Sequence, residues 1–288
     1  MDYSRFCEIM NVCIFEHGKR DLLEKIAESP ERFLGLFRPS KPETKILQNL
    51  LQSHEIRFGR ALEQFIENLV EDMGFSNLPK IIHVGEEKLS LDQFFTDGST
   101  CFFIEQKIRD DHDSSKKRGQ IDNFRKKLAY LSVHYSPLTG IMYFVDPSLA
   151  KNRVYYESEL KQLEESYGVP LHLFYGKDIF AFLGKPEYWD MMIDWLKRWK
   201  EDIPMIPEID FDSNPEKSFW EIKDLPVSRW QKILQKDELW EQGIIKVLFR
   251  RGATLTRLAE YFLARQESEY QEVGKLLQER VERYYRSV

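Results

Sequence analysis

The sequence is poor in cysteine and contains no cysteine–histidine spacing typical of zinc sites. Its 288 residues include three cysteines, Cys7, Cys13 and Cys101, which cannot all pair with one another, and Cys101 lies within an apolar segment of strand character. Proteins built on disulfide frameworks carry a dense, even set of cysteines. The scarcity of cysteine therefore predicts a protein of a reducing compartment, with a cytoplasmic location.

Long apolar runs and an excess of positive charge are also missing. No run approaches the ~18–20 residues that cross a bilayer, and the N-terminus lacks the basic-then-apolar order of a signal peptide, so we expect no membrane insertion. The 42 basic and 48 acidic residues give a net charge of −6, and binding of DNA would require the basic groups to gather on one face.

The most informative stretch of the chain runs from Leu91 to Gln120. Two apolar segments, Leu89–Phe95 and Cys101–Ile108, flank Thr-Asp-Gly-Ser at positions 96–99. An Asp-Gly pair between aromatic and β-branched segments is a strong signal for a β-hairpin. We therefore expect the two segments to pair as antiparallel strands.

Three side chains at the open end of this hairpin suit a metal site. Glu105 and Lys107 project from the same face of the second strand, about 7 Å apart, and Asp92 lies across from them. Mg²⁺ takes oxygen ligands, often one or two carboxylates, with water and substrate phosphate completing its shell. A nearby lysine can polarise the attacking water and stabilise developing charge. The arrangement predicts a divalent-metal site with an amine beside it.

The spacing of Asp92 and Glu105-Gln106-Lys107 resembles the active-site signature of the PD-(D/E)xK nucleases. Within that superfamily the chain is most similar to Type II restriction endonucleases, and the run from Glu105 to Gln120 is similar to the branch that cuts GANTC-type sites. Leu91 replaces the proline of the family name, at a position that varies in the family. The resemblance implies a Mg²⁺-dependent endonuclease acting on double-stranded DNA as a homodimer. Asp92 and Glu105 would hold the metal, and Lys107 would position or activate the water.

The tripeptide Glu-x-Lys alone decides nothing, because it occurs five times in the chain. The main rival is Glu221/Lys223, since Asp212 precedes it. Proline punctuates its surroundings, however, and no pair of predicted strands leads into it. The prediction therefore stays with Glu105 and Lys107.

A long helix is predicted over residues 43–73, ending before Gly74. Its expected buried stripe consists of Leu62, Phe65, Ile66, Leu69 and Met73. The resemblance implies that such a helix presents an acidic residue to the metal site, and Glu63 is the candidate. The alternative is a solvated glutamate near Arg60.

DNA-binding residues are expected directly after the metal strand. A loop of mixed charge, 109–118, leads into a predicted helix from Gly119, and the densest basic patch of the chain lies here: Lys116, Lys117, Arg118, Arg125, Lys126 and Lys127. Its position favours contact with DNA phosphates, whereas the alternative is an ordinary solvated helix face. Arg109, Gln120 and Asn123 are further candidates for DNA contact, and Gln120 could also orient water.

The order of elements predicts an α/β protein. A helix, three strands, a helix, a strand, a helix and a strand are typical of an α/β/α sandwich with a mixed sheet. The resemblance implies the same restriction-endonuclease-like core, with helical additions at both ends. We expect a helical segment over 1–42, the nuclease core over 43–185, and a mainly helical region over 186–288 for DNA recognition or dimerisation.

Two features of the C-terminal region leave alternatives open. Gly243–Arg265 could form a helix-turn-helix with Arg250, Arg251 and Arg257 toward DNA, or a plain helical hairpin. The region's tryptophans could stack on bases, but their spacing favours packing in a core.

Two other functions compete with restriction: a repair or junction-cleaving nuclease of the same fold, and a DNA-binding protein without catalysis. The long C-terminal half favours sequence-specific cleavage, because non-specific nucleases need little beyond the core. The presence of Asp92, Glu105 and Lys107 together argues against a protein that has lost activity.

Overall fold

The computed structural model describes residues 1–16, 18–35, 37, 39–204 and 207–285, and these form two compact units. Unit 1 comprises 1–13 and 57–203, and unit 2 comprises 14–56 and 204–288. Each unit thus draws on two separate stretches of sequence. The expected boundary at 42/43 falls inside unit 2, and the division into three functional segments stays a prediction. Residues 17, 36 and 38 of the first segment, and 205–206 and 286–288 of the last, lie outside the described residues.

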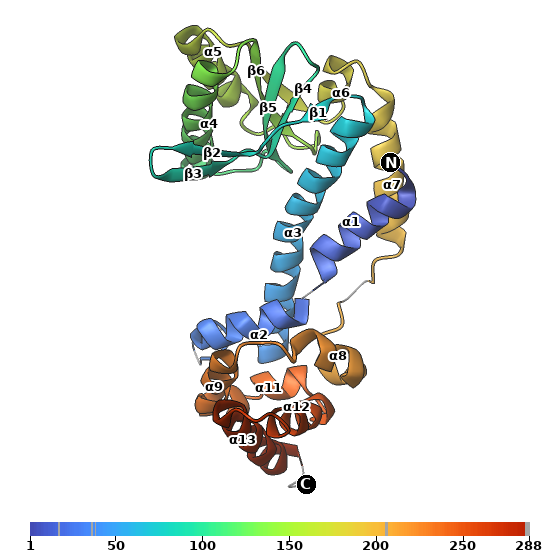
Figure 1. The fold of residues 1–288 in the computed structure, drawn as a ribbon, viewed down its shortest axis with the longest axis vertical. Helices are drawn as coiled ribbons and strands as arrows, with labels where there is room; N and C mark the ends of the chain where they lie inside the picture. The colour runs from blue at the N-terminus through green and yellow to red at the C-terminus, as the bar shows by residue number, and fades with distance from the viewer. Residues whose placement is uncertain (17, 36, 38, 205–206, 286–288) are drawn as a thin grey trace. The chain divides into compact units, whose positions relative to one another are not determined.

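Unit 1 is built on a five-stranded sheet of order β1-β4-β5-β6-β7 (Figure 1). Its strands are β1 (Ser76–Asn77), β4 (Gln93–Thr96), β5 (Cys101–Lys107), β6 (Leu138–Phe144) and β7 (Leu171–Tyr175). The first three strands pair antiparallel, and β5, β6 and β7 run parallel. The prediction of a mixed central sheet is confirmed.

The central strand β6 is buried at every position, as its continuous apolar sequence predicts. Gly140 within it has a steric role. A Cβ atom there would lie 2.6 Å from the Phe103 ring and 2.6 Å from the Leu171 side chain, closer than atoms can pack. The glycine therefore lets β5 and β7 side chains close over β6.

Helices cover both faces of this sheet (Figure 1). One face packs on α4 (Ser114–His134) and α5 (Arg153–Tyr167), and its core includes Phe103, Phe124 and Tyr156. On the other face, Phe182 of α6 (Asp178–Phe182) contacts Phe102 of β5 and Phe174 of β7. The remaining helices of unit 1 are α1 (Tyr3–Phe15, mostly), α7 (Glu187–Glu201) and the C-terminal part of α3 (Pro42–Asp72). The expected α/β/α architecture is confirmed.

The long helix α3 matches the prediction over 43–73, and its expected apolar stripe is buried. The first hairpin strand differs from the prediction, because Leu89–Phe95 is divided. Residues 87–90 form β3 (Glu87–Ser90), which pairs with β2 (Ile81–Val84) in a separate two-stranded sheet, and β4 begins only at Gln93. The pattern of apolar and polar residues along the chain does not show that one apolar run contributes strands to two different sheets.

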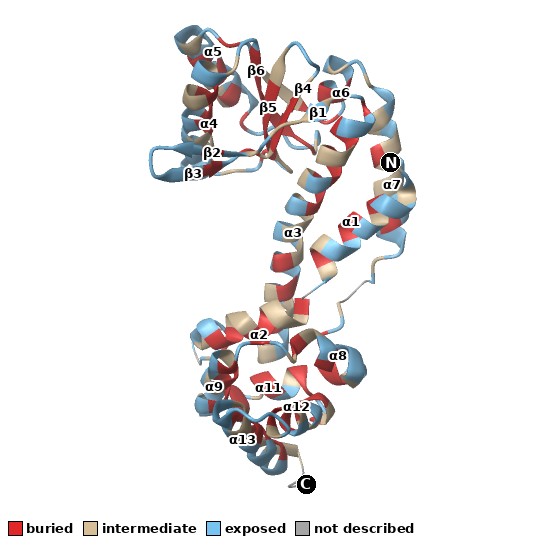
Figure 2. Ribbon diagram, viewed as in Figure 1, coloured by how far each residue is buried: buried red, intermediate tan, exposed pale blue. Residues whose placement is uncertain are grey.

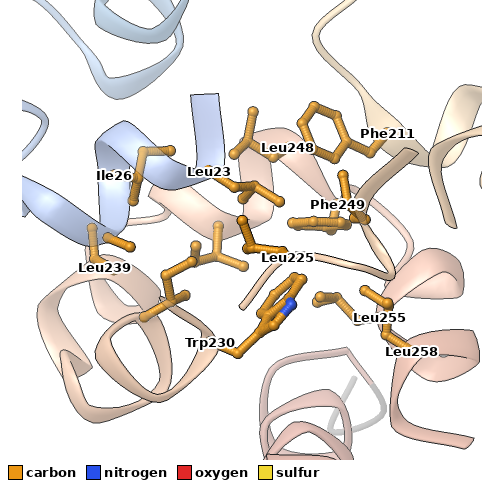
Figure 3. Close-up of a cluster of buried hydrophobic side chains, with 14 of the residues drawn as sticks. Leu23, Ile26, Phe211, Leu225, Trp230, Leu239, Leu248, Phe249, Leu255 and Leu258 are labelled. Atoms are coloured by element: carbon orange, nitrogen blue, oxygen red, sulfur yellow. The ribbon is translucent and has the colours of Figure 1, made fainter. Parts of the chain in front are cut away.

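The regular secondary structure of unit 2, over its described residues, consists of helices. Besides the start of α3 it contains α2 (Gly18–Glu28), α8 (Pro215–Ile222), α9 (Val227–Gln235), α10 (Asp237–Glu241), α11 (Ile244–Leu248), α12 (Ala253–Leu263) and α13 (Ser268–Tyr285), with short 3-10 helices at Pro30–Arg32 and Phe211–Ser213. Apolar side chains from α2, α9 and α12 meet in its core (Figure 3).

The burial pattern tests the expectation for the tryptophans (Figure 2). Trp230 and Trp240 are buried, so packing in a core is confirmed for them. Trp220 is 62% exposed, and the expectation is wrong there, because α8 turns this side chain to solvent. In the part of the chain that the structure describes, no helix is both long and apolar enough to span a membrane.

Candidate active site

The register of β4 and β5 brings Asp92 to the end of β5. Gln93 pairs with Ile104, so Asp92, the residue before β4, lies level with Glu105. The tight turn between the strands contains Gly98 with φ of 93°, a left-handed conformation that glycine adopts readily. The main-chain amide of Gln106 donates a 2.7 Å hydrogen bond to Asp92 Oδ2. The predicted convergence of these residues is present in the fold.

Lys107 joins the two carboxylates. Its Nζ lies 3.1 Å from Asp92 Oδ2 and 2.8 Å from Glu105 Oε1, and it also donates to the carbonyl of Gln106. The two carboxylate oxygens are therefore no further apart than the sum of those two distances. That separation is well inside the ~10 Å beyond which one cation could not reach both groups.

Burial and charge act in opposite directions on these groups. Burial, followed by the negative charge of Glu105, raises the pKa of Asp92. Burial also tends to raise the pKa of Glu105, but the ammonium groups of Lys107 and Lys127 outweigh it and lower that pKa. Burial tends to lower the pKa of Lys107, and the charges of Glu105 and Asp92 reverse this and raise it. Near neutral pH Glu105 is therefore ionised and Lys107 protonated.

Glu63 stands beside this group on α3. Burial, followed by the charge of Asp92, raises the pKa of Glu63 to about 7. The side-chain amide of Gln93 donates a 2.7 Å hydrogen bond to the Glu63 carbonyl, which ties α3 to the start of β4. Glu67, one turn further, is engaged by Lys80 at 2.8 Å. The charge of Asp92 contributes to the raised pKa of Glu63, so Glu63 lies close to the carboxylate group, and its role in the site stays a prediction.

The prediction that Lys127 belongs to a basic patch facing DNA is wrong. Its side chain is buried, and its Nζ lies 2.5 Å from Glu105 Oε2. The signal is present in the sequence, because the buried stripe of α4 consists of Ile121, Phe124, Lys127, Leu128 and Leu131. A lysine at an apolar position of an amphipathic helix is expected to need a buried partner.

The other basic candidates differ in exposure. Lys116 and Arg118 are exposed near the start of α4. That helix begins at Ser114, earlier than predicted, because Asp113 accepts hydrogen bonds from the amides of Ser115 and Lys116 and caps it. Arg109 is exposed, and its Nε lies 3.5 Å from Asp146.

The remaining candidates for DNA contact are engaged within unit 1. Lys117 donates to the Asn152 side chain at 3.2 Å and lies over the Tyr155 ring. Gln120 accepts a 2.6 Å hydrogen bond from the Tyr156 hydroxyl. Asn123 donates to Glu105 Oε1 at 3.4 Å, so it touches the carboxylate site.

A buried carboxylate without a sequence signal of its own, Asp110, supports the loop after β5. Asp110 is fully buried and accepts hydrogen bonds from the amide and side chain of Asn152, each 2.8 Å, and from the Tyr175 hydroxyl at 2.9 Å. Because Lys117 also binds Asn152, this network fixes the loop between Lys107 and α4. No local sequence motif indicates this network, because the hydrogen-bond partners of Asp110 come from distant segments of the chain.

The rival pair Glu221/Lys223 has no comparable setting. Glu221 lies on helix α8 and accepts from the Lys19 amide, Lys223 pairs with Asp224, and the buried Asp212 accepts from the amides of Arg251 and Thr254. In the proposed helix-turn-helix segment, Arg250 pairs with Glu43 and Arg251 bonds the Asp212 carbonyl, while Arg257 is exposed. The helix-turn-helix and the plain helical hairpin both stay predictions.

The donors present fit a hard divalent cation. Two carboxylates already share one positive group, the ammonium of Lys107, and carboxylate oxygen is the ligand type that Mg²⁺ prefers. Among the described residues no group of three or more His, Cys, Asp and Glu side chains could hold an ion. A cation here would rest on Asp92 and Glu105, with water and phosphate as further ligands.

Comparison with models of protein families gives a match to HinfI, described as Type II restriction endonuclease, HinfI, over residues 3–83 and 78–200. The matched residues include the whole hairpin and all of α4. Comparisons with curated proteins and with solved structures give no match.

Proposed function

Because the chain belongs to the HinfI family of Type II restriction endonucleases, and so is a sequence-specific DNA-cleaving enzyme, we propose that Asp92, Glu105 and Lys107 form its catalytic centre. The observation that carries the proposal is the contact of Lys107 Nζ with both carboxylates. Enzymes of this kind typically use a divalent metal, and we propose Mg²⁺.

Asp92 and Glu105 would hold the metal. When bound, Mg²⁺ makes water a stronger nucleophile at neutral pH and offsets charge on the phosphoryl group. The chain's own contribution is to place the groups. The Gln106 amide fixes Asp92, and Lys107 can orient the attacking water and stabilise the charge of the transition state. Glu63, with a pKa of about 7, is proposed as an accessory group that can hold or release a proton near neutral pH.

Lys116 and Arg118 are proposed to contact DNA phosphates, and Arg109 lies on the same loop-helix segment. Lys117 and Gln120 are proposed to position this segment rather than to read bases, because their polar atoms are engaged within unit 1. Asn123 is proposed to orient Glu105. The mainly helical region over 186–288 is proposed to serve recognition or dimerisation.

We propose further that the target is of the GANTC type and that the enzyme acts as a cytoplasmic homodimer. A palindromic site matches two-fold protein symmetry. The dimer would be tested by light scattering on the protein with and without a GANTC duplex.

The catalytic proposal is tested by digesting long DNA with and without GANTC sites in Mg²⁺, using the wild-type protein, Asp92→Ala and a chelator control. We expect discrete fragments ending at GANTC only with wild-type protein and Mg²⁺. A fragment pattern unrelated to GANTC would reject the target, and cleavage by Asp92→Ala at the wild-type rate would reject the site.

A further inference from the structure

The carboxylate pair is contacted by two lysines that differ in their freedom to move. Lys107, from the end of β5, has a side chain 27% exposed, whereas the side chains of Lys127 and Glu105 are each 4% exposed. Lys107 binds Glu105 through Oε1, and Lys127 binds it through Oε2 at 2.5 Å. The two oxygens of one carboxylate are thus held from two different elements, β5 and α4.

Lys127 is buried, and its ammonium pairs with Glu105. Its neighbours on the buried stripe of α4 are Phe124, Leu128 and Leu131. Moving the ammonium away from Glu105 would leave a charge among apolar side chains, which is costly. Lys107 is more exposed and can move from the carboxylates toward the attacking water when another cation takes its place. Lys127 is therefore fixed on Glu105, whereas Lys107 is free to adjust within the site.

The charges of the site balance before any metal binds. Asp92 and Glu105 contribute two negative charges, and Lys107 and Lys127 contribute two positive charges. Nearby, Glu67 and Lys80 neutralise each other. Glu63 is a further acidic side chain nearby. A divalent cation therefore meets two proposed ligands that two ammonium groups already neutralise.

We propose that Lys127 is the fixed counter-charge of Glu105 and keeps the affinity of the free protein for a divalent cation low. This inference rests on the proposed role of Asp92 and Glu105 as metal ligands. An ammonium on one oxygen of Glu105 repels any cation bound by the same carboxylate, and the repulsion is strong because the group is withdrawn from water. A DNA phosphate adds negative charge to the site, so the same lysine makes tight cation binding depend on DNA.

The test is a titration of the free protein with Mn²⁺, in which unbound Mn²⁺ is measured by electron paramagnetic resonance. Lys127→Gln and Lys127→Met remove the charge and should each bind Mn²⁺ at least about tenfold more tightly than wild-type protein. Lys127→Arg keeps the charge and should stay close to the wild-type affinity. Thermal unfolding of each variant identifies those that fold, and Gln retains a hydrogen-bond donor to Glu105 should Met not be tolerated.

Lys126→Met is the matched control. Lys126 is the adjacent lysine of α4, but it is exposed and pairs with Glu87 at 3.1 Å, so its loss should leave Mn²⁺ affinity unchanged. Equal or weaker Mn²⁺ binding by folded Lys127→Gln would overturn the inference. Failure of the proposed metal site itself looks different, because then Asp92→Asn and Glu105→Gln would bind Mn²⁺ as the wild-type protein does.

Discussion

The main-chain amide of Gln106 holds Asp92 Oδ2 at 2.7 Å. Because the donor belongs to the backbone of β5, the pairing of β4 with β5 sets the position of this carboxylate. The hairpin has its own buried apolar side chains, which do not depend on Asp92: Phe94, Phe95, Phe102, Phe103 and Ile104. The site can therefore lose its carboxylate while the surface that meets DNA keeps its form.

We accordingly expect Asp92→Ala and Lys107→Ala to reduce the cleavage rate by about 10²-fold or more, since each removes a group that acts on the transition state. DNA affinity, measured by fluorescence anisotropy with a GANTC duplex, should change little. Lys223→Ala, in the rival Glu-x-Lys sequence, is the control and should cleave normally. Normal cleavage by both site variants would contradict the assignment.

The raised pKa of Glu63 predicts a pH dependence of stability. Folding raises this pKa from 4.5 to about 7, so the folded state binds the proton more strongly than the unfolded state. The stabilisation is complete below about pH 4.5 and is lost as pH rises to about 7. Because the Glu63 side chain is partly exposed, solvent reduces its contribution to the free energy of unfolding, which we place on the order of 1 kcal/mol.

Glu63→Gln should remove that part of the dependence. We expect the free energy of unfolding from urea titrations to decline less between pH 5 and pH 8 in the variant than in the wild-type protein. An identical decline in both proteins would show that burial of Glu63 does not perturb its proton affinity.

Sequence patterns predicted the parts of the fold that depend on neighbouring residues. The Asp-Gly turn placed Asp92 against Glu105, and the apolar period of α3 identified the stripe that is buried. The other parts of the fold depend on which strands pair with one another in three dimensions. The predicted strand over Leu89–Phe95 is interrupted at Leu91 because β3 pairs with β2 in a separate sheet. An apolar run has the same sequence pattern whether its residues belong to one sheet or to two.

The residues of the active site also divide into those that local sequence predicts and those that depend on contacts between distant segments. Asp92, Glu105 and Lys107 could be named because their spacing is local to one hairpin. Lys127 belongs to a different element, and a count of basic residues grouped it with exposed neighbours. The helical period distinguishes the two lysines, because position 127 falls among the apolar positions of α4 and position 126 does not. The burial of Lys127 could therefore be predicted from the sequence once the helix was assigned.

Exposure on α4 predicts which lysine contacts phosphate. Lys116→Ala should weaken DNA binding and lower the slope of log affinity against log salt by about 0.9, the value for one phosphate contact. Lys161→Ala is the control, an exposed lysine on α5 of the same unit. The measurement is anisotropy over a series of salt concentrations. A slope equal to that of the wild-type protein would remove Lys116 from the phosphate contacts.

The Asp110 network makes a prediction about stability. Asp110→Ala leaves the Asn152 amide, the Asn152 side chain and the Tyr175 hydroxyl without their acceptor in a buried place. Hydrogen bonds to a charged acceptor are strong and buried unpaired donors are costly, so we expect a loss of roughly 2–4 kcal/mol in the free energy of unfolding. Asp111→Ala, at the exposed neighbour, should stay within about 0.5 kcal/mol of the wild-type protein. Because the network anchors the loop between Lys107 and α4, Asp110→Ala should also reduce cleavage in the fraction that remains folded. Equal stabilities of the two variants in urea titrations would mean that the loop is held by other contacts.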